Sequence, residues 1–305
     1  MMFEDEFKGR IFFVESPFQL MCILSDIDPL DRLIMRPTSK KIRDRMLNIL
    51  KWDHSIENYS IYYSDYRIFK LLYIIIISFM LLISRQTLIC IGNFNCKVAQ
   101  IVRCLGRDRL LVFYDDGSGT FRILSEWDER PRIYFKTIFY NYFTNRQDIL
   151  RNDIDLHSIK KTISKGEIFI IGTKLSENGL MSEVLYVELL NKVCSLFKNK
   201  SVIYCPHCEE RLEKFQENNL EVQIENISCP IEEYLMHRST TPEYIITMGS
   251  TAGLSLKLIF DYEVYYLKIS DLVSDTKHLP NARSYLKKLE SVYGFYKINK
   301  LNLGD

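Results

Sequence analysis

Short apolar runs alternate with helix-like segments along most of the chain. Ser16 can cap a helix whose first position is Pro17, and a second segment with helical spacing stops at Gly106. Three apolar runs beside these segments predict buried strands over residues 9–15, 87–92 and 109–114. This β-α-β order predicts a parallel sheet with right-handed crossovers.

The same alternation resumes after a polar, aperiodic stretch over residues 145–167. We place a domain boundary in this stretch, with an N-terminal domain over 1–150 and a C-terminal domain over 151–305. In the second domain, a helix with an apolar stripe is expected over 181–199. Strands are expected over 168–173, 201–206, 221–226, 243–250 and 264–269. Two α/β domains with parallel sheets predict a central ligand cleft outside the carboxyl ends of the strands.

The overall charge and the cysteines limit the classes of protein that fit. The 305 residues carry a formal net charge of +1, which gives no electrostatic case for nucleic acid binding. Eight cysteines lie without the spacing of a disulfide framework, and the charged first residues lead directly into a strand-like run. We therefore expect a cytoplasmic protein without a signal peptide.

The most apolar segment is LLYIIIISFMLLIS, residues 71–84. It is shorter than the roughly 20 residues that a membrane-spanning helix needs. We expect a buried helix of the core, and the alternative is a surface that dips into a membrane. Basic patches such as residues 40–45 could assist a peripheral contact with the inner face of the membrane, but the favoured interpretation of these residues is solvated helix charge.

Two adjacent carboxylates stand where the strand over 109–114 ends. Asp115 and Asp116 are followed by four small residues. Like charges side by side raise the pKa of one carboxyl group, and beside a cleft such a group can act as a general base. The alternative is a solvated turn that contains glycine.

A second candidate site follows the strand over 243–250. Gly249, Ser250 and Thr251 connect this strand to a helix, and the unpaired N–H groups at a helix start suit a phosphate. The segment lacks the Walker lysine and the dinucleotide glycine spacing, and the alternative is a plain helix cap. Glu232 or Glu233, at another helix start, could accept hydrogen bonds from ribose hydroxyls, unless both are simple helix charges.

A histidine follows the strand over 201–206. His207 comes directly after Pro206 and could donate to a phosphate or act as an acid, and the alternative is a satisfied surface histidine. Cys205 and Cys208 have the spacing of half a zinc site. Because no second ligand pair accompanies them, a non-enzymatic zinc-binding interaction protein is the less favoured alternative.

Together, and in this order, the motifs resemble those of the bacterial sialyltransferases. YDDGSGT is similar to their acidic-acidic-Gly motif, PHCEE to their His-Pro motif, and GST to their serine/threonine pair. ESPFQLM, residues 15–21, resembles the matching segment of glycosyltransferase family 52, the lipooligosaccharide sialyltransferases. The matches run from about residue 11 to about residue 260, and Cys208 stands where the family usually has proline.

This resemblance implies a GT-B-type α/β fold with two Rossmann-like domains whose parallel sheets face a central cleft. The N-terminal domain would lie on the acceptor side, and the C-terminal domain would hold the nucleotide sugar. Sialic acid would pass from CMP-sialic acid to a terminal galactose-type hydroxyl of a bacterial surface glycan, a lipooligosaccharide or capsule. The transfer would be inverting and would need no metal and no cofactor. The alternative is the same fold with a different nucleotide-sugar donor. A homodimer is also expected.

The resemblance also assigns the proton-transfer roles. Asp115 or Asp116 would take the proton from the acceptor hydroxyl. Apart from the resemblance, the segment over 172–183 puts Glu177 and Glu183 at a strand's end in the donor half, so either could serve as the base instead.

The remaining roles concern the donor nucleotide. His207, after Pro206, would stabilise or protonate the departing CMP phosphate. Ser250 and Thr251, after Gly249, would hold that phosphate. Glu232 or Glu233 would hold the ribose. A histidine, two hydroxyls and a helix start can offset the charge that develops on the leaving phosphate, so magnesium would be dispensable.

Overall fold

The computed structural model describes residues 9–52, 56–84, 87–106, 108–124, 127–128, 130–154, 161–218, 220, 222–227, 229–277 and 279–303. The chain divides into two units, Met1–Asp155 and Leu156–Asp305, and each is described by itself.

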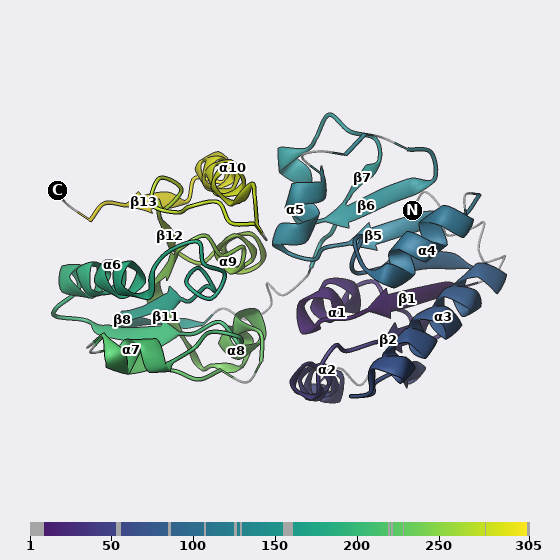
Figure 1. Cartoon of the computed structure of the whole chain (residues 1–305), viewed down its shortest axis with the longest axis horizontal. Helices are drawn as coiled ribbons and strands as arrows, with labels where there is room; N and C mark the ends of the chain where they lie inside the picture. Colours follow the sequence, from purple (N-terminus) through teal and green to yellow (C-terminus); the bar gives the residue numbers. More distant parts are fainter. Residues whose placement is uncertain are drawn as a thin grey trace. The chain divides into compact units, whose positions relative to one another are not determined.

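The first unit contains a parallel sheet of seven strands in the order β3-β2-β1-β4-β5-β6-β7 (Figure 1). The strands are β1 (Arg10–Val14), β2 (Arg32–Met35), β3 (Tyr59–Ile61), β4 (Leu88–Ile91), β5 (Leu111–Tyr114), β6 (Ile133–Thr137) and β7 (Ile149–Arg151). Every residue of β4 and β5 is buried, as expected for central strands that are covered on both faces. The sheet confirms the parallel β-α-β prediction.

Helices connect these strands and cover both faces of the sheet. They are α1 (Pro17–Leu24), α2 (Lys40–Trp52), α3 (Arg67–Ile83), α4 (Lys97–Leu105) and α5 (Ser118–Leu124), with a short 3-10 turn at Tyr140–Tyr142. α3 packs against α4 on one face, and α1 packs against α2 on the other, as right-handed crossovers require. Ser16 Oγ accepts a hydrogen bond from Gln19 N at 3.2 Å, which confirms the predicted cap and the start at Pro17.

The second unit contains a parallel sheet of six strands in the order β10-β9-β8-β11-β12-β13. The strands are β8 (Thr162–Ile171), β9 (Ser201–Cys205), β10 (Gln223–Ile224), β11 (Thr240–Thr247), β12 (Val264–Leu267) and β13 (Asn299–Leu301). The helices are α6 (Glu183–Leu196), α7 (Glu213–Glu217), α8 (Ile231–His237), α9 (Ala252–Phe260) and α10 (Ala282–Phe295). Both sheets therefore have the doubly wound order of a Rossmann fold, 3-2-1-4-5-6 by strand position, and the first adds a seventh strand.

Three expectations about local structure need correction. The stretch over 145–167 contains β7 and the start of β8 in its described part, and residues 155–160 lie outside that part. The strand expected over 221–226 is reduced to β10, whose two residues are both exposed. The apolar segment over 71–84 is helical, but the expectation of a buried core helix is wrong. Only Ile77, Ser78 and Leu81 of α3 are buried, because one side of the helix packs on the sheet and the other faces outward.

The core of the first unit lies between its sheet and the pair α3 and α4. Phe13 and Ile91 of the central strands pack there against Ile77 and Leu81 of α3 and Val102 of α4. No helix in the described part of the chain has the length and hydropathy needed to cross a bilayer.

Candidate functional site

The carboxyl edge of the first sheet gathers the polar residues that follow its central strands. In a doubly wound sheet, ligands bind outside this edge where the strand order reverses, which here is between β1 and β4. Glu15 follows β1, Gly92 follows β4, and Asp115 with Asp116 follows β5. The strands are parallel, so all of these residues lie at one edge.

Asp115 is fully enclosed. Its side chain is 0% exposed, and its carboxylate accepts hydrogen bonds from Thr137 Oγ1 at 2.6 Å and from Ile138 N at 2.8 Å. Burial raises the pKa of Asp115 to about 7, although these hydrogen bonds act in the opposite direction. The two contacts tie the end of β5 to the end of β6. Asp115 is therefore placed to support the turn and not to touch a substrate.

Asp116 is the half-buried member of the pair. Gln19 Nε2 donates to Asp116 Oδ1 at 2.6 Å, and Asp116 N donates to Thr120 Oγ1 at 2.7 Å. Burial raises the pKa of Asp116 to about 6. The hydrogen bond from Gln19 lowers it, and the charge of Glu15 raises it. The predicted repulsion between the two aspartates is thus a minor cause, and burial is the main one.

Sequence reasoning missed the residues that hold Asp116 in place. Gln19 is 1% exposed, and its Oε1 accepts a hydrogen bond from Glu15 N at 2.7 Å. A Cβ atom at Gly92 would stand 2.7 Å from Gln19 Cβ, so only glycine leaves room for this side chain. Arg36, after β2, forms an ion pair with Glu15. The signal was present in ESPFQLM, whose glutamate ends a strand and whose glutamine lies one helical turn away.

The carboxyl edge of the second sheet carries the predicted donor residues. Its strand order reverses between β8 and β11, and β9 lies on the other side of β8. His207 follows β9, and Gly249 follows β11. Because neighbouring strands are about 4.8 Å apart, the ends of β9 and β11 lie about 10 Å apart at this edge.

The loop of His207 is held by backbone contacts. His207 N donates to Glu210 Oε2 at 2.9 Å, and Glu209 N donates to His207 Nδ1 at 3.2 Å. With Nδ1 acting as an acceptor, the proton of a neutral ring sits on Nε2. The half-buried His207 can therefore present an N–H donor to a ligand.

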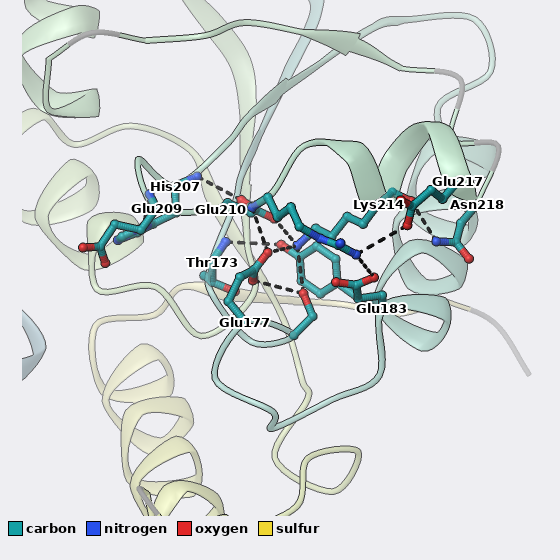
Figure 2. Close-up of polar contacts among 12 residues, drawn as sticks. Thr173, Glu177, Glu183, His207, Glu209, Glu210, Lys214, Glu217 and Asn218 are labelled. Carbon is teal, nitrogen blue, oxygen red and sulfur yellow. Dashed lines mark hydrogen bonds and ion pairs between the residues drawn. The ribbon is translucent and has the colours of Figure 1, made fainter.

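An ion cluster around the buried Lys214 lies beside this loop and contacts it through Glu210 (Figure 2). Lys214 is 0% exposed, and its Nζ contacts Glu210 Oε1 at 2.8 Å, Glu177 Oε1 at 2.9 Å and Ser176 Oγ at 2.9 Å. Tyr204 OH also donates to Glu210 Oε1 at 2.6 Å. Burial raises the pKa of Glu210, and the contacts with Lys214 and Tyr204 offset part of that rise. The cluster joins the loops after β8 and β9 and thereby fixes the backbone position of the histidine.

The two alternative bases both lie in ion pairs. Glu177 accepts from Lys214 and also from Arg211 N at 3.0 Å, and Glu183 Oε2 contacts Arg211 Nη2 at 2.5 Å. Burial acts to raise the pKa of Glu177, but the hydrogen bonds from Lys214 and Arg211 leave it below its ordinary value. A carboxylate held in this way is a weak proton acceptor, so its role is to neutralise Lys214.

The loop after β11 leads directly to the first residue of α9, Ala252. Gly249 has φ 71°, a left-handed conformation that favours glycine. Ser250 Oγ accepts a hydrogen bond from Ala252 N at 3.3 Å, and Thr251 stands at the N-cap position with no side-chain capping bond. Both hydroxyl residues are half-buried. A helix start with two hydroxyls can bind a phosphate group.

The two ribose candidates lie deeper than expected. Glu232 and Glu233 occupy the first turn of α8 and are 4% and 6% exposed. Ser255 Oγ, in α9, donates to Glu232 Oε1. Burial raises the pKa of Glu232, and this hydrogen bond lowers it. The structure thus places Glu232 against the same helix that Ser250 and Thr251 begin.

In the part of the chain that the structure describes, Cys205 and Cys208 gain no further metal ligand. Cys205 is 3% exposed at the end of β9, whereas Cys208 is exposed. Among the residues that the structure describes, no group of three or more His, Cys, Asp and Glu side chains is placed to hold a metal ion.

Solved structures of low sequence identity share this fold. No protein-family model matches the chain, and no curated protein matches it. UDP-GlcNAc 2-epimerase from Neisseria meningitidis bound to UDP-GlcNAc is similar at TM-score 0.55 and 8% identity, over 97% of this chain and 95% of that one. S. aureus MnaA with UDP is similar at TM-score 0.54 and 10% identity, over 96% and 91%. The epimerase from Methanocaldococcus jannaschii, in complex with UDP-GlcNAc and UDP, is similar at TM-score 0.50 and 9% identity, over 94% and 99%.

At these identities the likeness concerns the fold alone. The chain has a GT-B-type α/β fold with two parallel sheets, as the resemblance to glycosyltransferases implied. Nothing in these neighbours singles out glycosyltransferase family 52.

Proposed function

We propose that this protein is a glycosyltransferase that uses a nucleotide-sugar donor, inverts the transferred sugar and needs no metal. The observation that carries the proposal is the raised pKa of Asp116 together with its hydrogen bond from Gln19. This half-buried carboxylate has its pKa raised to about 6 and is aimed by Gln19, at the ligand-binding edge of a GT-B-type unit. A general base is most effective when its pKa lies near the operating pH.

Asp116, and not Asp115, is the base in this mechanism. Asp116 would accept the proton of the acceptor hydroxyl as that oxygen attacks the sugar carbon of the donor. The enclosed Asp115 has both carboxylate oxygens engaged by the β6 end and would keep the turn rigid. One residue would thus do the chemistry while its neighbour keeps that residue in position.

The donor nucleotide would be bound by the second unit. Thr251, Ser250 and the N–H groups at the start of α9 would hold a phosphate, and His207 Nε2–H would donate to the departing one. These donors would offset the negative charge of the leaving nucleotide. Glu232, beside α9, would face the ribose once Ser255 releases it.

Two donor classes have separate support. The ordered motifs favour CMP-sialic acid, in line with the resemblance to family 52, and a galactose-type hydroxyl of a surface glycan as the acceptor. The structural neighbours were solved with UDP-GlcNAc or UDP, which favours a UDP-sugar. Because a helix start with two hydroxyls would suit a phosphate of either donor, we propose the UDP-sugar as the competing donor.

Nucleotide binding tests the donor half of the mechanism. The melting temperature of the protein should rise with the nucleotide of the true donor and not with the others among CMP, UDP and GDP. A ligand at a hundredfold excess over its Kd adds roughly 3 kcal/mol of stability. Thr251→Val should reduce this shift because it removes a hydroxyl at the phosphate site. If none of the three nucleotides shifts the melting temperature, this assignment of the second unit is wrong.

Transfer tests the acceptor half. Asp116→Asn should fold normally and lose roughly 100- to 10,000-fold in kcat, the range expected for removal of a general base. His207→Ala should also lose transfer while it still binds nucleotide. The exposed Asp128→Asn is the matched control and should keep full activity. Wild-type rates in Asp116→Asn would exclude this residue as the base.

A further inference from the structure

Helix α3 exposes a continuous apolar face. Several large hydrophobic side chains on it are more than a third exposed, whereas Ile77 and Leu81 on the opposite side are 0% exposed in the core. The exposed set is Ile68, Phe69, Leu71, Leu72, Ile75, Ile76, Phe79 and Ile83. Single exposed hydrophobic residues are ordinary on protein surfaces, but a contiguous set of this kind marks a surface that another partner covers.

The exposed residues follow the helical repeat. Positions 68, 72, 75, 79 and 83 fall on one stripe of the helix. At 1.5 Å per residue this stripe is about 22 Å long. The helix belongs to the core through its other side, so the stripe is rigidly mounted on the sheet of the first unit. Because the stripe runs along one side of a single helix, it can lie along a flat apolar surface.

One end of the stripe has a basic border. Lys70 Nζ donates to Thr38 O at 3.4 Å, and the Arg43 guanidinium lies 5.1 Å from the ring centre of Tyr63. These contacts bring the start of α2 beside the start of α3. Residues 38–45 and 62–70 together contain six basic and two acidic side chains, and of the six basic ones Arg45 is buried. Lys40, Lys41 and Arg67 are exposed there.

We propose that this face of α3 docks on the surface of an anionic lipid bilayer. The apolar stripe would enter the boundary between headgroups and acyl chains, with the helix parallel to the membrane, and the basic border would contact phospholipid headgroups. Tyr66, which belongs to the basic border and is 72% exposed next to the start of the stripe, is suited to the headgroup level. Apolar insertion and basic attraction are the two signals that stable peripheral binding requires.

The charge of the border favours a bilayer over a second copy of the chain. A symmetric dimer through α3 would bring two positively charged borders into one interface, and its own acids, Asp44 and Asp65, are too few to balance them. An anionic membrane supplies the missing negative charge over a wide area.

The position of the border connects this surface with the candidate site. α2 and α3 begin after β2 and β3, at the same carboxyl edge of the sheet as Asp116. A membrane-bound first unit would therefore have that edge close to lipid headgroups, where a lipid-linked acceptor glycan would be presented. Only this last point rests on the proposed function, and docking itself does not.

Vesicle binding by the full chain tests the docking. The protein should sediment with vesicles of phosphatidylglycerol and phosphatidylcholine, should bind vesicles of phosphatidylcholine alone at least tenfold more weakly, and should be released by salt. The double variant Ile75→Glu/Phe79→Glu replaces side chains that are 55% and 62% exposed, so its fold should be kept and its binding lost. Val184→Glu, equally exposed at 55% on α6, is the matched control and should bind like wild type.

The basic border is tested separately. Lys40→Gln/Arg67→Gln should weaken binding and flatten its dependence on salt while leaving the apolar stripe intact. Wild-type binding by the Ile75→Glu/Phe79→Glu variant, or no binding of the wild type to anionic vesicles, would overturn the proposal. A wild-type dimer that this variant converts to a monomer, without any vesicle binding, would also overturn it and would assign α3 to a contact between copies. None of these readouts depends on transferase activity.

Discussion

Replacing Asp115 with asparagine should change how the stability of the protein depends on pH. The carboxyl group is 0% exposed, and burial raises its pKa to about 7 in the folded state. In the unfolded chain its pKa is about 4. Between these two values the folded state keeps a proton that the unfolded state has lost. The contribution of the protonated Asp115 to the free energy of unfolding is therefore fully present below about pH 4. It is lost as the pH rises through about 7.

The size of the effect follows from a single proton. The free energy of unfolding should fall by about 1.4 kcal/mol per pH unit while the two states differ by one proton. Between about pH 4.5 and about pH 6.5 the wild type should thus lose roughly 3 kcal/mol relative to the variant. The asparagine side chain does not titrate, so Asp115→Asn should lack this slope. A constant offset between the two proteins would report only changed packing and hydrogen bonding at Thr137 and Ile138.

Urea unfolding at a series of pH values, followed by circular dichroism, measures this difference. Asp116 is present in both proteins, so its own titration largely cancels in the comparison. The exposed Asp128→Asn should follow the wild-type slope. Parallel curves for wild type and Asp115→Asn would show that the enclosed carboxyl does not hold its proton near neutral pH.

Two other perturbations test the support of the candidate site. Gln19→Leu removes the hydrogen bond that lowers the pKa of Asp116, so the acid limb of the kcat/KM profile should move upward from about pH 6; an unmoved limb would contradict the assigned role of Gln19. Lys214→Met leaves Glu210 buried without its cation and should cost about 3–5 kcal/mol in the free energy of unfolding, as urea titration would show. Lys214→Met/Glu210→Gln should recover part of this loss, and an equal or larger loss in the double variant would speak against coupling of the two charges.

The sequence was a good guide where structure is determined locally. Apart from Arg10 at the start of β1, the strands β1, β4 and β5 are continuous apolar runs, and burial on both faces allows few other placements. The start of α1 depends on Ser16 and Pro17, whose capping chemistry involves neighbouring residues only. The strand ends carried the candidate residues because parallel strands deliver them to one edge.

Contacts between residues far apart in the chain could not be predicted from the sequence. The hydrogen bond between Gln19 and Asp116 joins residues 97 positions apart. The segment ESPFQLM places Gln19 one helical turn after a strand end, but it does not indicate that Asp116 is the partner. Nothing in the sequence near Lys214 marks it as a buried residue, yet it is 0% exposed and contacts Glu177 and Glu210. The outcome for α3 has a similar cause: a helix that is apolar all round does not reveal which side the sheet will cover.

The proposed transfer itself is the most direct test of this account. The purified chain would be incubated with CMP-sialic acid and with UDP-sugars, each with a panel of galactosides and other glycans, in the presence of EDTA, and the products would be weighed by mass spectrometry. One donor should add a single sugar to an acceptor and release its nucleotide, and it should fail to do so with Asp116→Asn. Absence of transfer from every donor, or conversion of UDP-GlcNAc in the absence of any acceptor, would contradict the assignment of this fold to glycosyl transfer.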